Sequence, residues 1–222
     1  MQRFDLIIIG AGSGNSVIGP EHDDWNIAIV ERGLFGGTCL NVGCIPSKMF
    51  VFAAEVAELA RHGPELGLHT RFDGADWPAI RDRVFGRIDP IAAGGEDYRR
   101  GLDHVTVFAD DARFVGPKQL QVGDETITAD TIVLAAGARA HVPDVPGLEA
   151  VGFDTSDSIM RVDSLPERLI VLGGGYIAAE LGAVFGALGS EVTYVLRSDA
   201  MLREQDGEIS RRATEIYGRR FA

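Results

Sequence analysis

The two cysteines of the chain, Cys39 and Cys44, lie in one glycine-containing segment that runs from Gly36 to Lys48. Four residues separate the thiols, and an apolar stretch with helical spacing begins beside them at Pro46. A thiol at the start of a helix lies near the positive end of the helix dipole, which stabilises the thiolate and lowers the pKa of the thiol. Lys48, one turn beyond Cys44, adds a positive charge. The pattern favours a redox-active pair of thiols.

Other roles for two cysteines have to be weighed against this one. Free cysteines often pack in a core as small hydrophobic side chains. A structural disulfide across so short a loop would add modest stability to a chain that shows no sign of secretion. A metal site needs more ligands than two sulfurs, so we expect no bound metal. The nucleotide-binding motifs described next favour the redox interpretation.

A strand followed by a glycine turn occurs twice in the sequence. The apolar run 4–9 leads into Gly10-Ala11-Gly12-Ser13-Gly14-Asn15, and the run 169–172 leads into Gly173-Gly174-Gly175-Tyr176-Ile177-Ala178. Such continuous apolar runs are typical of parallel strands buried on both faces. After a short helix in the first case and a longer one in the second, another β-branched strand follows at 26–30 and at 191–196. We therefore predict an α/β fold with two Rossmann-like dinucleotide-binding domains, both incomplete in this chain.

The rest of the chain contains helices, a meander and a linker. Apolar residues at helical spacing predict helices over 44–62 and 76–100, the second interrupted near Pro90 and Gly94-Gly95. Short apolar runs separated by turns predict antiparallel strands over 104–134. A linker with proline and glycine at 143–147 separates the halves. We expect a nucleotide-binding domain at 1–147 and the start of a second one at 148–222.

Composition indicates a soluble, cytoplasmic enzyme. Hydrophobic residues make up 45% and charged residues 24%, which is ordinary for a globular chain, and the net charge is −12. That charge argues against nucleic acid or an anionic membrane surface as partner. We expect no membrane span, because no stretch approaches about 20 apolar residues. We also expect no signal peptide, because residues 4–9 already form a strand.

The first glycine turn fits a dinucleotide. Gly10 and Gly12 let the backbone turn tightly and approach a pyrophosphate at the helix start. Asn15 stands where the third glycine of the motif would be, so the strict fingerprint fails there. Glu31, at the end of the next strand, offers a carboxylate to ribose hydroxyls. A plain glycine turn is the alternative, but strand, turn and distal acid together favour nucleotide binding.

The second glycine turn has the strict pattern, with Ala178 as the third small residue. Its second strand ends in Arg197 instead of an acid, and Arg203 follows six residues later. Arginines at this point can pair with the 2′-phosphate of NADP, whereas a carboxylate selects NAD. The alternative is a pair of solvated surface arginines. The pattern predicts NADPH as the reductant.

These residues carry a resemblance. The segment Gly-Gly-Thr-Cys-Leu-Asn-Val-Gly-Cys-Ile-Pro-Ser-Lys from Gly36 resembles the redox-disulfide segment of the FAD-dependent class I pyridine nucleotide-disulfide reductases. The match extends over essentially the whole chain. Ala136-Gly137 resembles the family's second flavin contact, and 173–180 its nicotinamide segment. Within the family, segments 12–16, 48–56, 83–100 and 155–161 most resemble the mycothione reductases.

The resemblance implies a role for each matching residue. Electrons would pass from NADPH through FAD to a Cys39–Cys44 disulfide, with Cys44 as the charge-transfer thiolate and Cys39 as the interchange thiol that attacks a small disulfide substrate. Lys48 would point toward the flavin and pair with Glu180, and Tyr176 would cover the nicotinamide pocket. The alternative for Lys48 and Glu180 is a purely structural ion pair between domains, and the alternative for Tyr176 is an aromatic side chain of the core. The implied contacts to the cofactors are Gly10, Gly12, Ser13, Gly14, Glu31, Arg32, Gly37, Thr38, Lys48, Ala112, Ala136, Gly137, Gly173, Gly175, Tyr176, Ile177, Ala178, Arg197 and Arg203.

The family also implies parts that this sequence lacks. Its members are roughly twice as long and form homodimers, and the partner subunit supplies a His-Glu pair to protonate the leaving thiol. None of the five histidines, His22, His62, His69, His104 and His141, stands in that motif. We therefore expect a fragment that is inactive alone. Lipoamide dehydrogenase, a mercuric reductase-like flavoprotein and a non-catalytic nucleotide-binding module remain alternatives.

Overall fold

The computed structural model describes residues 1–221, which divide into two compact units. The first unit comprises Met1–Ile45 and Phe85–Leu148. The second comprises Pro46–Val84 and the described chain from Glu149 onward. The long segment after the cysteines thus belongs with the second unit. The assignment of a flavin domain to 1–147 and a nicotinamide domain to 148–222 stays a prediction.

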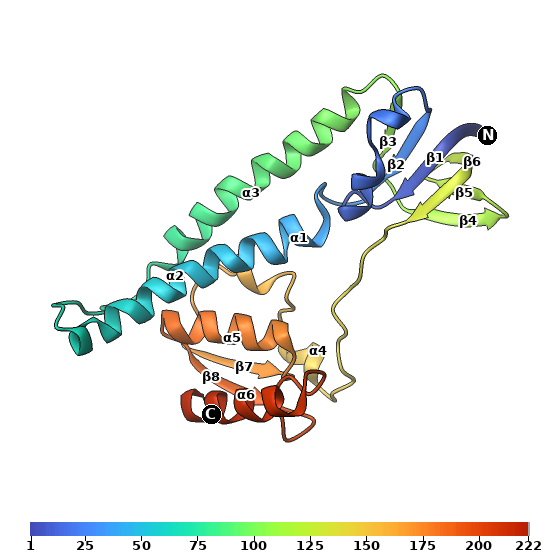
Figure 1. Ribbon diagram of the computed structural model, residues 1–222. Helices are drawn as coiled ribbons and strands as arrows, with labels where there is room; N and C mark the ends of the chain where they lie inside the picture. Colours follow the sequence, from blue (N-terminus) through green and yellow to red (C-terminus); the bar gives the residue numbers. More distant parts are fainter. Residues whose placement is uncertain (222) are drawn as a thin grey trace. The chain divides into compact units, whose positions relative to one another are not determined.

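The first unit is built on a six-stranded sheet with the order β3-β2-β1-β6-β5-β4 (Figure 1). Strands β3, β2, β1 and β6 run parallel, and β5 and β4 continue the sheet in antiparallel pairing. The strands are β1 Gln2–Ile9, β2 Ile27–Val30, β3 Val105–Phe108, β4 Ala112–Gly116, β5 Gln119–Val122 and β6 Glu125–Leu134. The parallel part of this sheet confirms the predicted α/β class.

Both faces of the parallel strands are buried. Ile7 lies beside Ala28 in one core cluster, and Ile8 lies beside Ile29 in another. All four side chains are fully buried. Successive side chains of a strand point to opposite faces, so a strand covered on both sides needs an unbroken apolar run. The sequence of β1 meets that requirement.

The expectation of antiparallel strands throughout 104–134 was only partly right. Strands β4, β5 and β6 form the antiparallel meander, but β3 pairs in parallel with β2. The long strand β6 joins the two arrangements, since it pairs antiparallel with β5 near its start and parallel with β1 over 127–134. Apolar alternation identifies a strand but not the direction of its neighbour, so the sequence left this open.

The helical segments between β1 and Cys44 are short, as expected for the one after the first glycine turn. A single 3-10 turn, η1 Ser13–Val17, follows that turn, and η2 Pro20–His22 comes before β2. Helix α1, Gly37–Asn41, carries Cys39. Helix α2, Cys44–His62, has the predicted bounds; it starts at Cys44 and ends in the short turn η3 Gly63–Leu66.

Helix α3 contradicts the predicted interruption. It runs without a break from Trp77 to Arg100, with Pro90 inside it and Gly94-Gly95 one turn later. Proline removes one hydrogen bond, and each glycine costs about 1 kcal/mol in a helix. Buried Phe85, Ile88 and Ala92 stabilise the helix on both sides of the proline. Packing of this apolar face outweighs the local preference.

The second unit contains a two-stranded parallel sheet covered by helix. Strand β7 Arg168–Leu172, helix α5 Tyr176–Leu188 and strand β8 Glu191–Val195 form the predicted strand-helix-strand motif (Figure 1). Its core stacks Trp77 between Phe50 and Phe185, with ring centroids 5.1 and 4.9 Å apart. The remaining elements are α4 Leu148–Val151, η4 Ile159–Arg161 and α6 Gly207–Arg220.

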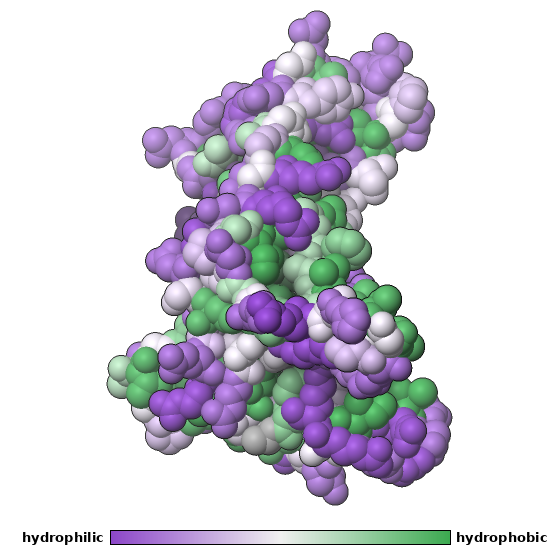
Figure 2. Space-filling view, turned by 90° about the vertical axis from the view of Figure 1, so that its left-hand side faces the viewer, coloured by the Kyte–Doolittle hydropathy of each residue, from purple (hydrophilic) through white to green (hydrophobic). Residues whose placement is uncertain are grey.

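One helical segment corrects the expectation about membrane spans. Gly37–Leu66 is long and apolar enough to cross a membrane by length and composition, with a mean hydropathy of 1.3 in its best window. A core helix of a globular protein passes the same test, so a single segment is weak evidence. Its exposed apolar side chains include Phe52 and Leu59. Figure 2 shows such apolar side chains interspersed with hydrophilic ones on the face in view.

Candidate functional site

The two cysteines lie on neighbouring helices of the first unit. Cys39 is in α1 and Cys44 is the first residue of α2, and both side chains are exposed. No disulfide joins them in this structure. Gly43 lets the chain return closely: a Cβ there would lie 2.8 Å from the carbonyl oxygen of Thr38 and 3.3 Å from Cα of Cys39. The exposure excludes the alternative of two buried structural cysteines.

The environment of Cys39 corrects the expected direction of its pKa. Hydrogen bonding to the Cys44 side chain raises the pKa of Cys39, with smaller raising contributions from desolvation and from the charge of Cys44. Backbone amides of Cys44 and Ile45 at the start of α2 lower the pKa of Cys39, as the helix dipole predicts, but they do not outweigh the neighbouring thiol. The two cysteine side chains thus lie close enough for each to affect the other.

The first glycine turn is packed too tightly for side chains. A Cβ at Gly10, where φ is +109°, would lie 2.1 Å from the carbonyl oxygen of Ala135. A Cβ at Gly37 would lie 2.6 Å from Cα of Gly12, and Gly36 donates from its amide to the carbonyl of Ala11 at 2.8 Å. The cysteine segment and the nucleotide turn thus touch through backbone alone.

Asn15 replaces the third glycine and holds the turn together. Its side chain is buried and donates from Nδ2 to the carbonyl of Gly10 at 2.9 Å. The Oδ1 atom of Asn15 is buried with no hydrogen-bond partner. Gly12 provides no side-chain cap for η1. A helical turn that begins after a glycine and has no side-chain cap suits a pyrophosphate, so the residues present are compatible with FAD.

Three residues predicted to contact the cofactor, Glu31, Arg32 and Ala112, lie after the ends of β2 and β3. Glu31 accepts hydrogen bonds from the amides of Ala11 at 2.8 Å and Gly33 at 2.7 Å. A carboxylate has further lone pairs available for ribose hydroxyls. Arg32 pairs with Asp111 at 3.0 Å, which brings Ala112, the first residue of β4, close to the Glu31 end.

The predicted second flavin contact lies near the cysteine helix. A Cβ at Gly137, where φ is +70°, would lie 4.0 Å from the hydroxyl of Thr38. Ala136 lies close to the first turn, because the Cβ that Gly10 lacks would lie 3.3 Å from the amide nitrogen of Ala136. The first unit therefore brings Gly10, Thr38 and Ala136-Gly137 into one region. Ser13 and Gly14 continue the same turn.

The expected ion pair between Lys48 and Glu180 is present within the second unit. The Nζ atom of Lys48, on α2, contacts Oε1 of Glu180, on α5. The Oγ atom of Ser47 also lies 3.4 Å from that carboxylate oxygen. Both residues belong to the second compact unit. Sequence reasoning missed Ser47, since only the packing of α2 on α5 brings it to Glu180.

The second glycine turn presents open backbone. No heavy atom lies within 4 Å of a Cβ added at Gly173 or Gly175, and Gly173 has a φ of +115°. Gly175 provides no side-chain cap for α5, whose first residues are Tyr176, Ile177 and Ala178. The side chain of Tyr176 is 72% exposed, which excludes a core aromatic. These residues fit a nicotinamide nucleotide.

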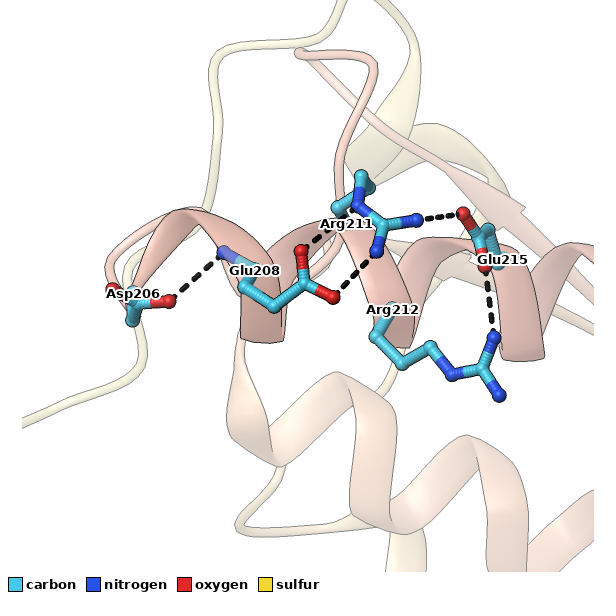
Figure 3. Close-up of polar contacts among 5 residues, drawn as sticks. All are labelled: Asp206, Glu208, Arg211, Arg212 and Glu215. Atoms are coloured by element: carbon cyan, nitrogen blue, oxygen red, sulfur yellow. Dashed lines mark hydrogen bonds and ion pairs between the residues drawn. The ribbon is translucent and has the colours of Figure 1, made fainter.

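The arginines that follow β8 differ in their charge compensation. Arg211 pairs with Glu208 and Glu215, and Arg212 pairs with Glu215 at 3.2 Å (Figure 3). Arg203 pairs with Glu204 at 3.1 Å. Arg197 is exposed directly after β8 and forms no ion pair within the described residues. Its guanidinium is therefore available to a phosphate.

The described residues contain no group of three or more histidine, cysteine or acidic side chains that could hold a metal ion.

A parallel α/β unit whose glycine turn touches the segment that carries two thiols is the arrangement expected of a nucleotide-dependent thiol–disulfide oxidoreductase. The model of the pyridine nucleotide-disulphide oxidoreductase family matches residues 4–220. The chain belongs to that family, as its motifs predict. Members of the family use FAD and a nicotinamide nucleotide.

Relatives cover nearly the whole chain. It is 46% identical over 224 residues to a mycothione reductase of Mycobacterium tuberculosis, covering 97% of this chain and 48% of that protein. It is 38% identical to a mercuric reductase of Staphylococcus aureus, covering 93% of this chain and 38% of that protein. The copper(II) complex of RclA, an HOCl-induced flavoprotein disulfide reductase of Escherichia coli, superposes with a TM-score of 0.81 at 25% identity, over 97% of this chain and 47% of RclA. The chain thus spans about half or less of the length of each.

Proposed function

We propose that this chain is part of an FAD-dependent, NADPH-linked reductase of low-molecular-weight disulfides. The observation that carries the proposal is the backbone contact between the nucleotide turn at Gly12 and the cysteine segment at Gly37. It joins a dinucleotide site to a dithiol within one compact unit. Bound FAD would relay an electron pair from NADPH to the Cys39–Cys44 disulfide.

The cysteines then perform thiol–disulfide exchange. The thiolate of Cys39 attacks one sulfur of the substrate disulfide, forms a mixed disulfide and expels one substrate thiolate, which takes up a proton. The thiolate of Cys44 attacks the sulfur of Cys39, which restores the Cys39–Cys44 disulfide and expels the second thiolate. One substrate disulfide and two protein thiols give two substrate thiols and one protein disulfide. The hydrogen bond between the side chains of Cys39 and Cys44 supports their action as a pair.

Other residues would bind and orient the nucleotides. Lys48, held by Glu180, would place a positive charge where negative charge develops on FAD. Arg197 would contact the 2′-phosphate of NADPH, and Tyr176 would lie over the nicotinamide site. The uncompensated charge of Arg197 and the exposure of Tyr176 support these two roles.

Mycothione is the substrate that we propose. The 46% identity to a mycothione reductase, spread over 97% of the chain, supports this choice over glutathione disulfide and lipoamide. We expect the complete protein to be a cytoplasmic homodimer. We expect neither nucleic acid nor a membrane as its partner.

The test uses the protein expressed from its complete reading frame and loaded with FAD. NADPH consumption is followed with mycothione, glutathione disulfide and lipoamide as substrates. We expect the highest kcat/KM with mycothione, and complete loss of activity in Cys39→Ser and Cys44→Ser. Retention of activity in both cysteine variants would overturn the dithiol mechanism, and a preference for another disulfide would overturn the substrate.

Reduction of a soft metal ion is the second candidate. Mercuric reductase of Staphylococcus aureus is 38% identical, and two neighbouring exposed thiols suit a soft metal. The same preparation, assayed with Hg(II) as electron acceptor, distinguishes the two. NADPH oxidation that depends on Hg(II) and exceeds the rate with mycothione would favour the metal reductase.

A further inference from the structure

Asn41, between the two cysteines, is a buried residue with two directed hydrogen bonds. It is the last residue of α1 and is only 5% exposed. Its Nδ2 atom donates to the carbonyl of Phe35 at 2.8 Å and to the carbonyl of Gly37 at 3.1 Å. Because both neighbouring acceptors are carbonyl oxygens, the NH₂ group of the Asn41 amide, and not its oxygen, must point toward Phe35 and Gly37. The contacts of Asn41 depend on its donor atoms.

These two hydrogen bonds fix a loop in which the two glycines have no side chain to anchor them, while the side chain of Phe35 beside them packs in the core. Phe35 and Gly37 flank Gly36, and the two glycines have φ values of +98° and +60°. Glycine permits such angles but does not favour one conformation over others. The same loop contacts the nucleotide turn, through the Gly36 amide to Ala11 and through Gly37 against Gly12. Asn41 therefore fixes the loop at the point where it meets the turn.

Cys39 depends on the position of this loop. Helix α1 has five residues, which is too short to be stable without tertiary contacts. Without the Asn41 side chain, the carbonyl of Phe35 loses a buried hydrogen bond and the carbonyl of Gly37 loses a part-buried one. A buried carbonyl without a donor is destabilising. The loop and α1 would relax together and carry Cys39 away from Cys44.

We propose that Asn41 is a positioning residue, which fixes the helix of Cys39 to the nucleotide turn and so holds the two thiols at bonding distance. This inference rests on the proposed function, because it treats Cys39 and Cys44 as a dithiol that cycles with a disulfide. Asn41 itself takes no part in the exchange.

The test measures the thiol–disulfide equilibrium of the FAD-loaded protein from its complete reading frame. The protein is equilibrated in dithiothreitol redox buffers, and the fraction with a Cys39–Cys44 disulfide is read by alkylation and mass spectrometry. Asn41→Asp keeps the shape of the side chain but replaces the donating NH₂ group by an oxygen. Asn41→Ser, which keeps a shorter side chain with one donor, is used if the aspartate variant does not fold. We expect the equilibrium to shift at least tenfold toward the dithiol, because separated thiols have a lower effective concentration.

Ser190→Ala is the matched control. Ser190 is also a buried polar side chain that donates to a loop carbonyl, that of Pro166 at 2.6 Å, but it lies outside the glycine turns and the cysteine segment. We expect this variant to lose stability and to keep the wild-type thiol–disulfide equilibrium. If the Asn41 variants fold and keep that equilibrium, the positioning role is wrong. If wild-type protein forms no disulfide at all, the proposed function fails and the inference fails with it.

Discussion

Gly12 and Gly37 lie backbone against backbone, so that a single methyl group on Gly37 would lie 2.6 Å from Cα of Gly12. The first belongs to the nucleotide turn after β1, and the second opens the helix that carries Cys39. This contact joins two segments that 24 intervening residues separate in the sequence. The absence of side chains at both positions is therefore a requirement of the site.

Substitution of Gly37 tests that contact. Gly37→Ala adds a methyl group at a φ of +60° and against Gly12, so we expect destabilisation by roughly 2 kcal/mol or more and weak retention of FAD. Urea unfolding and the flavin absorbance that remains after gel filtration measure the two effects. Gly67→Ala is the control, because Gly67 has a φ of +80° but no neighbour within 4 Å of the added Cβ. It should cost about 1 kcal/mol and leave FAD bound; equal effects of both variants would contradict the argument.

The influence of Cys44 on the pKa of Cys39 predicts a pH effect. The Cys44 side chain raises the pKa of Cys39, whereas amides at the start of α2 lower it. Cys44→Ala removes the raising contributions and keeps the lowering ones, so the pKa of Cys39 should fall. At pH 7 the thiolate fraction of Cys39 then increases, and iodoacetamide should alkylate it faster than in the reduced wild-type protein. Rates measured from pH 5 to 10 locate the pKa; a higher pKa in the variant would contradict the assignment.

The pair of Lys48 and Glu180 should matter more for activity than for stability. The Lys48 side chain is 66% exposed, and exposed ion pairs contribute about 0–1 kcal/mol. We expect Glu180→Gln to change the thermal midpoint little and to lower kcat at least tenfold in the FAD-loaded complete protein. Asp73→Asn, which breaks the exposed pair of Arg71 and Asp73, should change neither quantity. Wild-type kcat in Glu180→Gln would remove Glu180 from the site.

Arg197 should decide the choice between the two nicotinamide nucleotides. Arg197→Glu places a carboxylate at the end of β8, which repels a 2′-phosphate and can accept from a ribose hydroxyl. We expect KM for NADPH to increase by roughly 10- to 100-fold, in line with the loss of a charge-assisted contact, and KM for NADH to stay the same or fall. Arg212→Gln is the control, because Arg212 is already paired with Glu215. An unchanged KM for NADPH in the Arg197 variant would show that this arginine is only a solvated surface residue.

Local patterns in the sequence identified the strands, the glycine turns and the cysteine segment. A nearly continuous apolar run such as that of β1 is required for a strand buried on both faces, and the pattern is visible without the neighbours. The bounds of α2 follow from its helical periodicity in the same way. The segments that carry chemistry were found because each needs particular residues at fixed spacing.

Only the tertiary structure decided what depends on neighbours distant in the sequence. Residues 105–108 pair in parallel because β2 lies beside them, and α3 continues through Pro90 because its buried face outweighs one lost hydrogen bond. The pKa of Cys39 is raised because the Cys44 thiol outweighs the helix amides. Ser47 and Asn41 became visible as parts of the site only through their contacts. Sequence patterns report on local conformation and burial, whereas these outcomes are balances between competing contacts that the fold alone brings together.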